Sequence, residues 1–304
     1  IGAVAIGHNA LSASQAVIGT ALGYLALEDM TNGAGNTALG YRASEQVTEA
    51  AYNTVVGHQA LNAETQGDKS TAIGYQSLYV QNGVDGEVSN TAIGYSAGKA
   101  ISTGIKNVII GSNTALVSTT INNAVIIGQA ACGDGNLVTS GTATASADGL
   151  VAVGRLAGYA AVSTAGTTLV GMDSGKALTT GDYNTAVGYN SLITEDAGSG
   201  NTAIGYQALK VCNNDTGGNT AVGKDGLIAV TSGNNNTAVG LGAGSNLQTG
   251  TNNVFIGRNS QANGTGGVNQ IVIGGIDTEG NGDNTVTLGN QDATAVYMGE
   301  EGGA

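Results

Sequence analysis

An aliphatic residue followed directly by glycine recurs along the whole chain, most often with a spacing of 17 residues. A representative copy is Asn201-Thr-Ala-Ile-Gly-Tyr-Gln-Ala-Leu209, and we number the positions of each copy from its central glycine, position 0. These glycines are Gly7, Gly23, Gly40, Gly57, Gly74, Gly94, Gly111, Gly128, Gly154, Gly171, Gly188, Gly205, Gly223, Gly240, Gly257, Gly274, Gly289 and Gly299. A fixed period of this kind indicates a repeat architecture.

The residues around each glycine predict strands and turns. Position −1 is aliphatic in every copy, Asn recurs at −4, and Gly, Asn, Ser and Thr fill the segments between copies. A helical repeat needs about 33 residues or more, and so many Gly, Asn, Ser and Thr residues disfavour helices. The chain is therefore predicted to be all-β, a parallel β-solenoid of about 17 coils. Each coil is expected to hold a strand at Thr-Ala-Ile-Gly and a shorter one at the following x-Ala-Leu.

Strand alternation divides each copy into two faces. Thr at −3 and the aliphatic residue at −1 share one face, and Ala at −2 and the glycine share the other. We expect the aliphatic column to be interior, so that aspartate at Ile204 disrupts nearby coils. The expected core ladder includes Ile73, Ile93, Ile110, Ile127, Val187, Ile204, Val222, Val239 and Ile256. The Asn column is expected to form a ladder of side-chain hydrogen bonds.

Composition excludes several classes. The 304 residues include 52 glycines but no proline, so the chain is not collagen. The hydrophobic fraction of 41% is too high for a disordered chain, and no apolar run is long enough to cross a membrane. A net charge of −13 argues against nucleic-acid binding. Cys132 and Cys212 are too few for a disulfide scaffold or a zinc site, and neither a metal nor a cofactor is predicted.

The predicted core is thin for a chain of this length. Eighteen aliphatic side chains bury little apolar surface compared with the entropy lost on ordering the whole backbone. Further burial is therefore expected between chains, at the small, flat Ala/Gly face. A closed symmetric oligomer follows from this argument.

The Asn-Thr-Ala-Ile-Gly unit, with a small residue or Leu after it, resembles the YadA-like head repeats of trimeric autotransporter adhesins. It is still closer to the head-like repeats of bacteriophage tail-fibre proteins, over residues 3–299. This resemblance implies a left-handed β-roll in a homotrimeric rod, with two further copies, other tail-fibre or virion proteins, and a host-cell glycan or protein receptor as partners. The implied location is the virion tail fibre, outside the cell.

The C-terminal segments Asn284–Gly289 and Val296–Ala304 resemble the end of a phage fibre upstream of a self-cleaving intramolecular chaperone. The resemblance therefore implies a maturation cut near residue 304. An alternative is the head of a bacterial trimeric adhesin at the cell surface, and the coding sequence beyond residue 304 distinguishes the two. A chaperone there favours the phage fibre, and a coiled coil with a membrane anchor favours the adhesin.

We expect a single repeat array over 1–304, with regular coils at 3–274 and shortened coils at 275–304. Insertions break the period near 78–89 and 131–149, and extra residues in a solenoid project as loops. Loops of this kind are where specific contacts are usually made. The candidate receptor contacts are Asn82, Asp85, Glu87, Asp134, Asn136 and Asp148.

Several motifs resemble functional sites but fit the repeat. Gly94–Lys99 and Gly171–Lys176 have one residue too few between their glycines for a phosphate-binding loop. His8 and His58 occupy the +1 position that tyrosine fills in other copies, and Cys132 occupies the +4 position of leucine.

Two further functions are compared: an enzyme, which is not expected, and an ice-binding solenoid, which is kept as an alternative. Paired carboxylates in the turns would suit a glycoside hydrolase, but the chain lacks the tryptophan that often stacks on sugars, and no catalytic residue is assigned. An ice-binding solenoid needs an exposed threonine ladder. The stacked threonines share the face of the aliphatic column, so they are expected to point inward.

Overall fold

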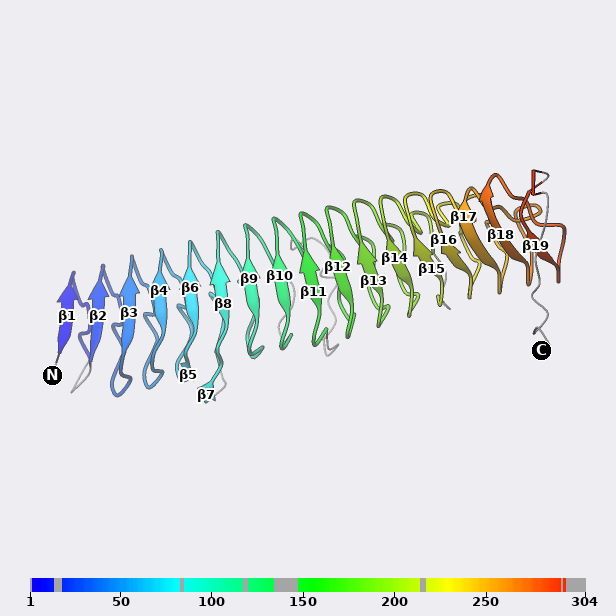
Figure 1. Ribbon diagram of the computed structural model, residues 1–304. Coiled ribbons are helices and arrows are strands. Elements are labelled where there is room, and N and C mark those ends of the chain that lie inside the picture. The colour runs from blue at the N-terminus through cyan, green and yellow to red at the C-terminus, as the bar shows by residue number, and fades with distance from the viewer. Residues whose placement is uncertain are drawn as a thin grey trace, which may run out of the picture. The chain divides into compact units, whose positions relative to one another are not determined.

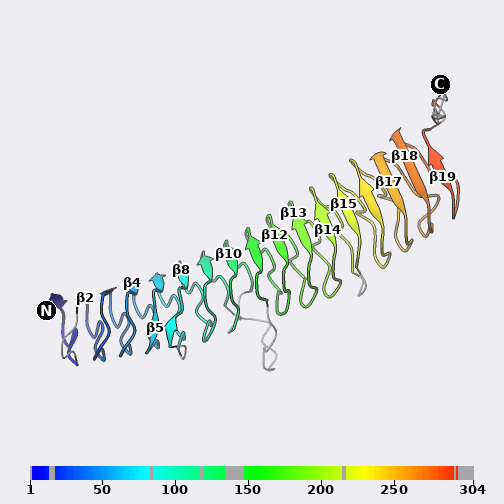
Figure 2. The same cartoon turned by 60° about the horizontal axis from the view of Figure 1, so that its bottom comes forward.

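The computed structural model describes residues 2–13, 18–82, 85–116, 120–133, 147–213, 217–290 and 292–293. Within these ranges there are strands and turns but no helix. The chain divides into two compact units, Ile1–Asn184 and Thr185–Ala304. In each unit, successive strands stack side by side (Figures 1 and 2).

The first unit contains β1 (Ala3–Ile6), β2 (Gly19–Leu22), β3 (Asn36–Leu39), β4 (Thr54–Val56), β5 (Gly67–Asp68), β6 (Thr71–Ile73), β7 (Gly86–Glu87), β8 (Thr91–Ile93), β9 (Val108–Ile110), β10 (Val125–Ile127), β11 (Val151–Val153) and β12 (Thr168–Val170). The second unit contains β13 (Thr185–Val187), β14 (Thr202–Ile204), β15 (Thr220–Val222), β16 (Thr237–Val239), β17 (Val254–Arg258), β18 (Ile271–Ile276) and β19 (Val286–Leu288).

The strands pair in parallel, and equivalent repeat positions lie opposite one another. Ala203 of β14 pairs with Ala221 of β15, which pairs with Ala238 of β16. Most neighbouring strands begin 17 residues apart. The predicted all-β parallel solenoid with a 17-residue repeat is therefore confirmed.

The predicted second strand of each coil is instead a turn. After most strands, the chain runs through turn residues in which positions +2 and +4 take positive φ, as at Gln207 (56°) and Leu209 (50°). Extended strand geometry requires negative φ, so this segment cannot pair as a strand. In the described residues a second strand pairing forms between β5 and β7, near the first insertion, and one isolated parallel bridge joins Gln261 to Glu279.

The core lies on the opposite strand face from the one predicted. None of the nine aliphatic residues of the expected core ladder is buried. Ile204 is 39% exposed, whereas its neighbour Ala203 is completely buried. The interior is filled by the −2 column together with +4 residues such as Leu209 and Leu227. The prediction of an inward aliphatic ladder and an outward Ala/Gly face was therefore wrong.

Size compensation inside the coil explains this arrangement. Where −2 is alanine, as at Ala203, position +4 is often a buried leucine, here Leu209. Where −2 is large, position +4 of the same or a neighbouring coil is small. A Cβ on Gly175 would press against Leu169, and one on Gly244 would press against Phe255. Because protein interiors are close-packed, a large side chain at −2 such as Leu169 or Phe255 requires a small residue at the +4 position that it packs against.

The predicted asparagine ladder is confirmed. Asn236 is completely buried, its Nδ2 donates to the carbonyl oxygen of Gly250 at 2.8 Å, and its Oδ1 accepts from the backbone N–H of Asn253 at 3.0 Å. One coil earlier, Asn219 Oδ1 accepts from the backbone N–H of Asn236 at 3.0 Å. Each amide therefore closes its own coil and joins it to the next, which satisfies backbone groups that burial removes from water.

Candidate functional site

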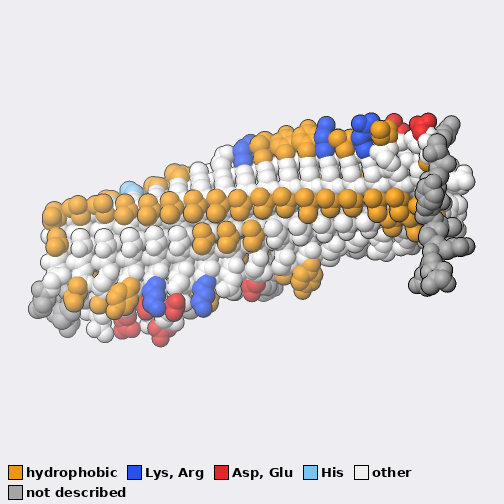
Figure 3. Space-filling model, in the orientation of Figure 1, with side chains coloured by type: hydrophobic (Ala, Val, Ile, Leu, Met, Phe, Trp, Pro, Cys, Tyr) orange, Lys and Arg blue, Asp and Glu red, His pale blue; other side chains and the backbone are white. Residues whose placement is uncertain are grey.

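Positions −1 and −3 of the strands form an uncharged, outward-facing surface in each unit. The aliphatic −1 column lies on this face, and Figure 3 shows a row of hydrophobic side chains that crosses the strands. Its most exposed members are Ile6, Leu22, Leu39, Ile93, Ile204, Val239, Ile256, Ile273 and Leu288. Threonine or valine at −3 runs beside it in most coils, including Thr37, Thr54, Thr71, Thr91, Thr185, Thr202, Thr220 and Thr237.

This surface contrasts with the rest of the chain. No residue at −1 or −3 in the strands is charged, although the chain has a net charge of −13. A row of aliphatic side chains in regular register is unusual on a protein surface that faces water alone. Such a face suits contact with another regular, uncharged surface.

A ladder of aromatic rings lies beside the aliphatic column in the first unit. His8, Tyr24, Tyr41, His58, Tyr75 and Tyr95 stack in order, with neighbouring ring centroids 4.8 to 5.4 Å apart. The prediction that both histidines occupy the tyrosine position is confirmed. No cluster of three potential metal-ligating side chains occurs in the described ranges.

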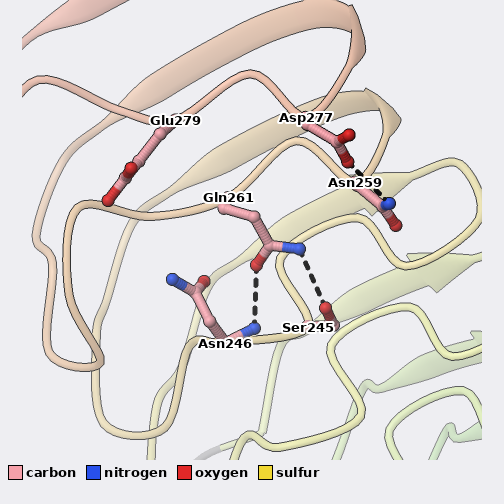
Figure 4. Close-up of a pocket in the computed structure, with 6 residues that line it drawn as sticks. All are labelled: Ser245, Asn246, Asn259, Gln261, Asp277 and Glu279. Atoms are coloured by element: carbon pink, nitrogen blue, oxygen red, sulfur yellow. Dashed lines mark hydrogen bonds between the residues drawn. The ribbon is translucent and has the colours of Figure 1, made fainter.

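A polar hollow of about 480 Å³ lies in the second unit, lined by Ser245, Asn246, Asn259, Gln261, Asp277 and Glu279 (Figure 4). Most of these groups bond to one another. Gln261 Nε2 donates to Ser245 Oγ at 2.9 Å, and Asn259 Nδ2 donates to Asp277 Oδ1 at 2.8 Å. The side chain of Glu279 extends from a separate part of the rim (Figure 4). The hollow thus presents carboxylate oxygens, with its amides largely engaged within the protein.

The predicted receptor-contact residues fall into two groups. Asp134 and Asn136 lie outside the described residues. The other four are exposed, and three of them contact neighbouring coils. Asn82 Oδ1 accepts from Thr65 Oγ1 at 2.8 Å, and Glu87 forms an ion pair with Lys69 at 3.3 Å. Asp148 Oδ1 accepts from the backbone N–H of Asn122 at 3.0 Å.

Both cysteines are free thiols inside the coils. Burial raises the pKa of Cys132 to about 12. Burial, and then the nearby carboxylate of Glu195, also raises the pKa of Cys212. Because thiolate is the reactive form, both cysteines are expected to be inert in the folded chain.

The glycine-rich motifs have structural roles. A Cβ on Gly98, which precedes Lys99, would press against Ile109 and Leu78 in the core, and a Cβ on Gly175 would press against Leu169. These glycines accommodate large neighbours in the core, as the repeat interpretation of both motifs implies.

Searches against models of protein families and against curated proteins find no match to this chain. No helix in the described ranges has the length and apolar character needed to cross a bilayer.

Proposed function

We propose that the chain is a structural and adhesive segment of a virus tail fibre, built as a homotrimer of left-handed β-rolls outside the cell. The outward aliphatic column is the main observation that supports the proposal. Side chains such as Ile204 and Val239 recur once per coil on an uncharged face. Burying such a face against two further copies removes apolar surface from water along a long contact.

This interface replaces the one expected from the sequence. The alanine column at −2 is already inside each coil, so association uses the aliphatic and threonine columns instead. In such a trimer the turns away from the aliphatic face point outward. Asn82, Asp85, Glu87 and Asp148 are exposed there, and repeated copies of such groups suit multivalent contact with a host-surface glycan or protein. No catalytic group is assigned.

Cysteine labelling tests whether the aliphatic face is covered. A thiol introduced by Ile204→Cys is expected to react with maleimide much more slowly than one introduced by Ser232→Cys. Ser232 is an exposed turn residue and serves as the matched control. The native thiols contribute little background because both are buried. Equal labelling rates at the two positions would contradict the proposed interface.

The head of a bacterial trimeric adhesin remains an alternative with the same interface. The sequence that follows residue 304 in the coding frame distinguishes the two: a chaperone favours the tail fibre, and a coiled coil with a membrane anchor favours the adhesin.

One observation favours a second candidate, an ice-binding solenoid. The sequence placed the threonine column inward, whereas the structure places it outward, with Thr37 and Thr54 exposed and paired in register. Strands about 4.8 Å apart then present ordered hydroxyl and methyl groups on one face. This function needs a free face, whereas the trimer covers it. Thermal hysteresis from a monomeric chain would support ice binding, and its absence would exclude it.

A further inference from the structure

Six tyrosines at position +1 form adjacent, nearly parallel pairs. Four belong to the aromatic ladder of the first unit and two lie at the equivalent position in the second unit, and all six are called ladder tyrosines below. In the first unit, Tyr24 and Tyr41 have ring centroids 5.2 Å apart and planes 13° apart, and Tyr75 and Tyr95 have values of 5.1 Å and 11°. In the second unit, Tyr189 and Tyr206 are 5.6 Å and 16° apart. All six rings are between 39% and 55% exposed. They are therefore both paired and accessible to solvent.

The scaffold holds each pair in place. The tyrosines of a pair lie at position +1 of neighbouring coils, just after strands that pair in register. Backbone hydrogen bonds fix the tyrosines as well: the carbonyl oxygen of Tyr24 accepts from the N–H of Arg42 at 2.8 Å, and that of Tyr75 accepts from the N–H of Ser96 at 2.8 Å. Such positioning gives two rings a high effective concentration relative to each other.

We propose that these pairs are sites of oxidative cross-linking, in which dityrosine links neighbouring coils of one chain. The oxidant is a one-electron oxidant of the kind that a peroxidase generates from hydrogen peroxide. Each phenol loses one electron and its hydroxyl proton, which gives two tyrosyl radicals. The radicals join through the ring carbons next to the hydroxyl groups.

The remaining steps balance the reaction. The hydrogen on each joined carbon leaves as a proton, and a proton returns to each phenoxyl oxygen, so both hydroxyl groups are restored. The pair loses two electrons and two protons in total, and hydrogen peroxide takes these up to form two water molecules. The bond first forms between carbons on the facing sides of two stacked rings, and each ring then turns about its side-chain torsions as the joined carbon loses its proton and becomes planar again.

Two other tyrosines distinguish the effect of ring stacking on the reaction from the effect of solvent exposure. Tyr52 and Tyr183 are 64% and 71% exposed, more than any ladder tyrosine. Neither contacts another aromatic ring in the described part of the chain. If exposure alone governs the reaction, these two react most. If stacking governs the reaction, links form within the ladder.

Peptide mapping tests the proposal. The purified full chain is treated with a peroxidase and limiting hydrogen peroxide, with free tyrosine oxidised in parallel to verify the oxidant. Cleavage after Glu, Lys and Arg separates the members of each pair, because Glu28, Glu87 and Glu195 lie between them. We expect linked peptides, two hydrogens lighter than their sum, that join Tyr24 to Tyr41, Tyr75 to Tyr95 and Tyr189 to Tyr206.

Matched variants and isotopes complete the test. Tyr41→Phe keeps a ring in the stack, so it should abolish the link to Tyr24 and leave the Tyr75–Tyr95 link unchanged. Tyr52→Phe should leave every link unchanged. When isotopically light and heavy chains are refolded together, each link should join two tyrosines with the same isotope label, because both belong to one chain. Links through Tyr52 or Tyr183 as abundant as ladder links, links that mix light and heavy chains, or no ladder link while free tyrosine is oxidised would each overturn the proposal.

Discussion

Ala203 and Ile204 are neighbours in β14, yet Ala203 is completely buried and Ile204 is 39% exposed. The small residue therefore faces the interior of the coil, and the large aliphatic residue faces outward. This relationship recurs at Ala238 and Val239. The coil thus completes its own core with the −2 column and leaves the larger side chains available for contact with another surface.

Aspartate substitutions at these two neighbours should have different effects. Ala203→Asp places a charge inside the coil and should lower the free energy of unfolding by about 3–5 kcal/mol. Ile204→Asp should leave the fold of the single chain intact, contrary to the disruption expected from sequence, and should weaken association instead. Circular dichroism during thermal unfolding, together with the solution mass, checks both variants. Equal loss of structure in the two would contradict the face assignment.

The asparagine ladder should contribute measurably to stability. Asn236→Ala removes the bonds to the carbonyl oxygen of Gly250 and the N–H of Asn253. The loss leaves buried backbone groups unpaired, which should cost about 1–3 kcal/mol. Ser232→Ala changes an exposed turn residue in the same repeat and is the control. Denaturant unfolding that gives the same stability for both variants would show that the ladder is not needed.

The central glycines should not tolerate a side chain. Gly188 has a φ of 142°, and an added Cβ would collide with the carbonyl oxygen of Gly205 in the next coil. Gly200 also has a positive φ, 70°, but an added Cβ there would meet nothing. Gly200→Ala should therefore cost about 1 kcal/mol from backbone strain. Gly188→Ala should cost about 2 kcal/mol or more beyond that, from overpacking.

The measurement for this pair is the free energy of unfolding in denaturant. A similar loss for the two glycine variants would mean that the coils can move apart to accept a methyl group at position 0.

Acid should destabilise the first unit through Glu45. Burial by itself would raise the pKa of Glu45, but hydrogen bonds from Arg42 and Asn62 and the Arg42 charge outweigh burial and hold the pKa below its ordinary value of 4.5. Arg42 Nε and Nη2 donate to the two carboxylate oxygens at 2.6 and 2.8 Å. Because the folded-state pKa is lowered, this stabilisation is present above the unfolded pKa and is lost as pH falls through the folded pKa.

Glu45→Gln should remove that part of the pH dependence. Unfolding free energies measured from neutral pH down to below the folded pKa should fall less steeply in the variant than in the unchanged chain. If the free energy of unfolding falls with pH equally steeply in both chains, the Arg42–Glu45 pair does not couple to folding.

The repeat made the fold predictable, but it did not determine which strand face is inside. A 17-residue period with a short aliphatic segment limits the chain to short stacked strands. Strand alternation then gives two faces, and residue size suggested that Ile204 was inside. The compensating sizes of Leu169 and Gly175 carried the missing signal, because only residues that share an interior need to compensate for each other.

Other features were less accessible to sequence reasoning. The left-handed backbone of Leu209, with φ of 50°, is uncommon for a leucine, so a strand was the natural prediction for its segment. The stacked histidine and tyrosine column could be located from its +1 position. The hollow around Gln261 follows from irregular register between β17 and β18, which the repeat pattern does not encode.

The solution mass of the unmodified chain, measured by light scattering, tests the proposed trimer most directly. One chain has a mass of 29.7 kDa. The outward aliphatic face predicts a stable species of three times that mass. A stable monomer of 29.7 kDa with intact β-structure would contradict the proposed assembly, because the aliphatic column would then be exposed to water along its whole length.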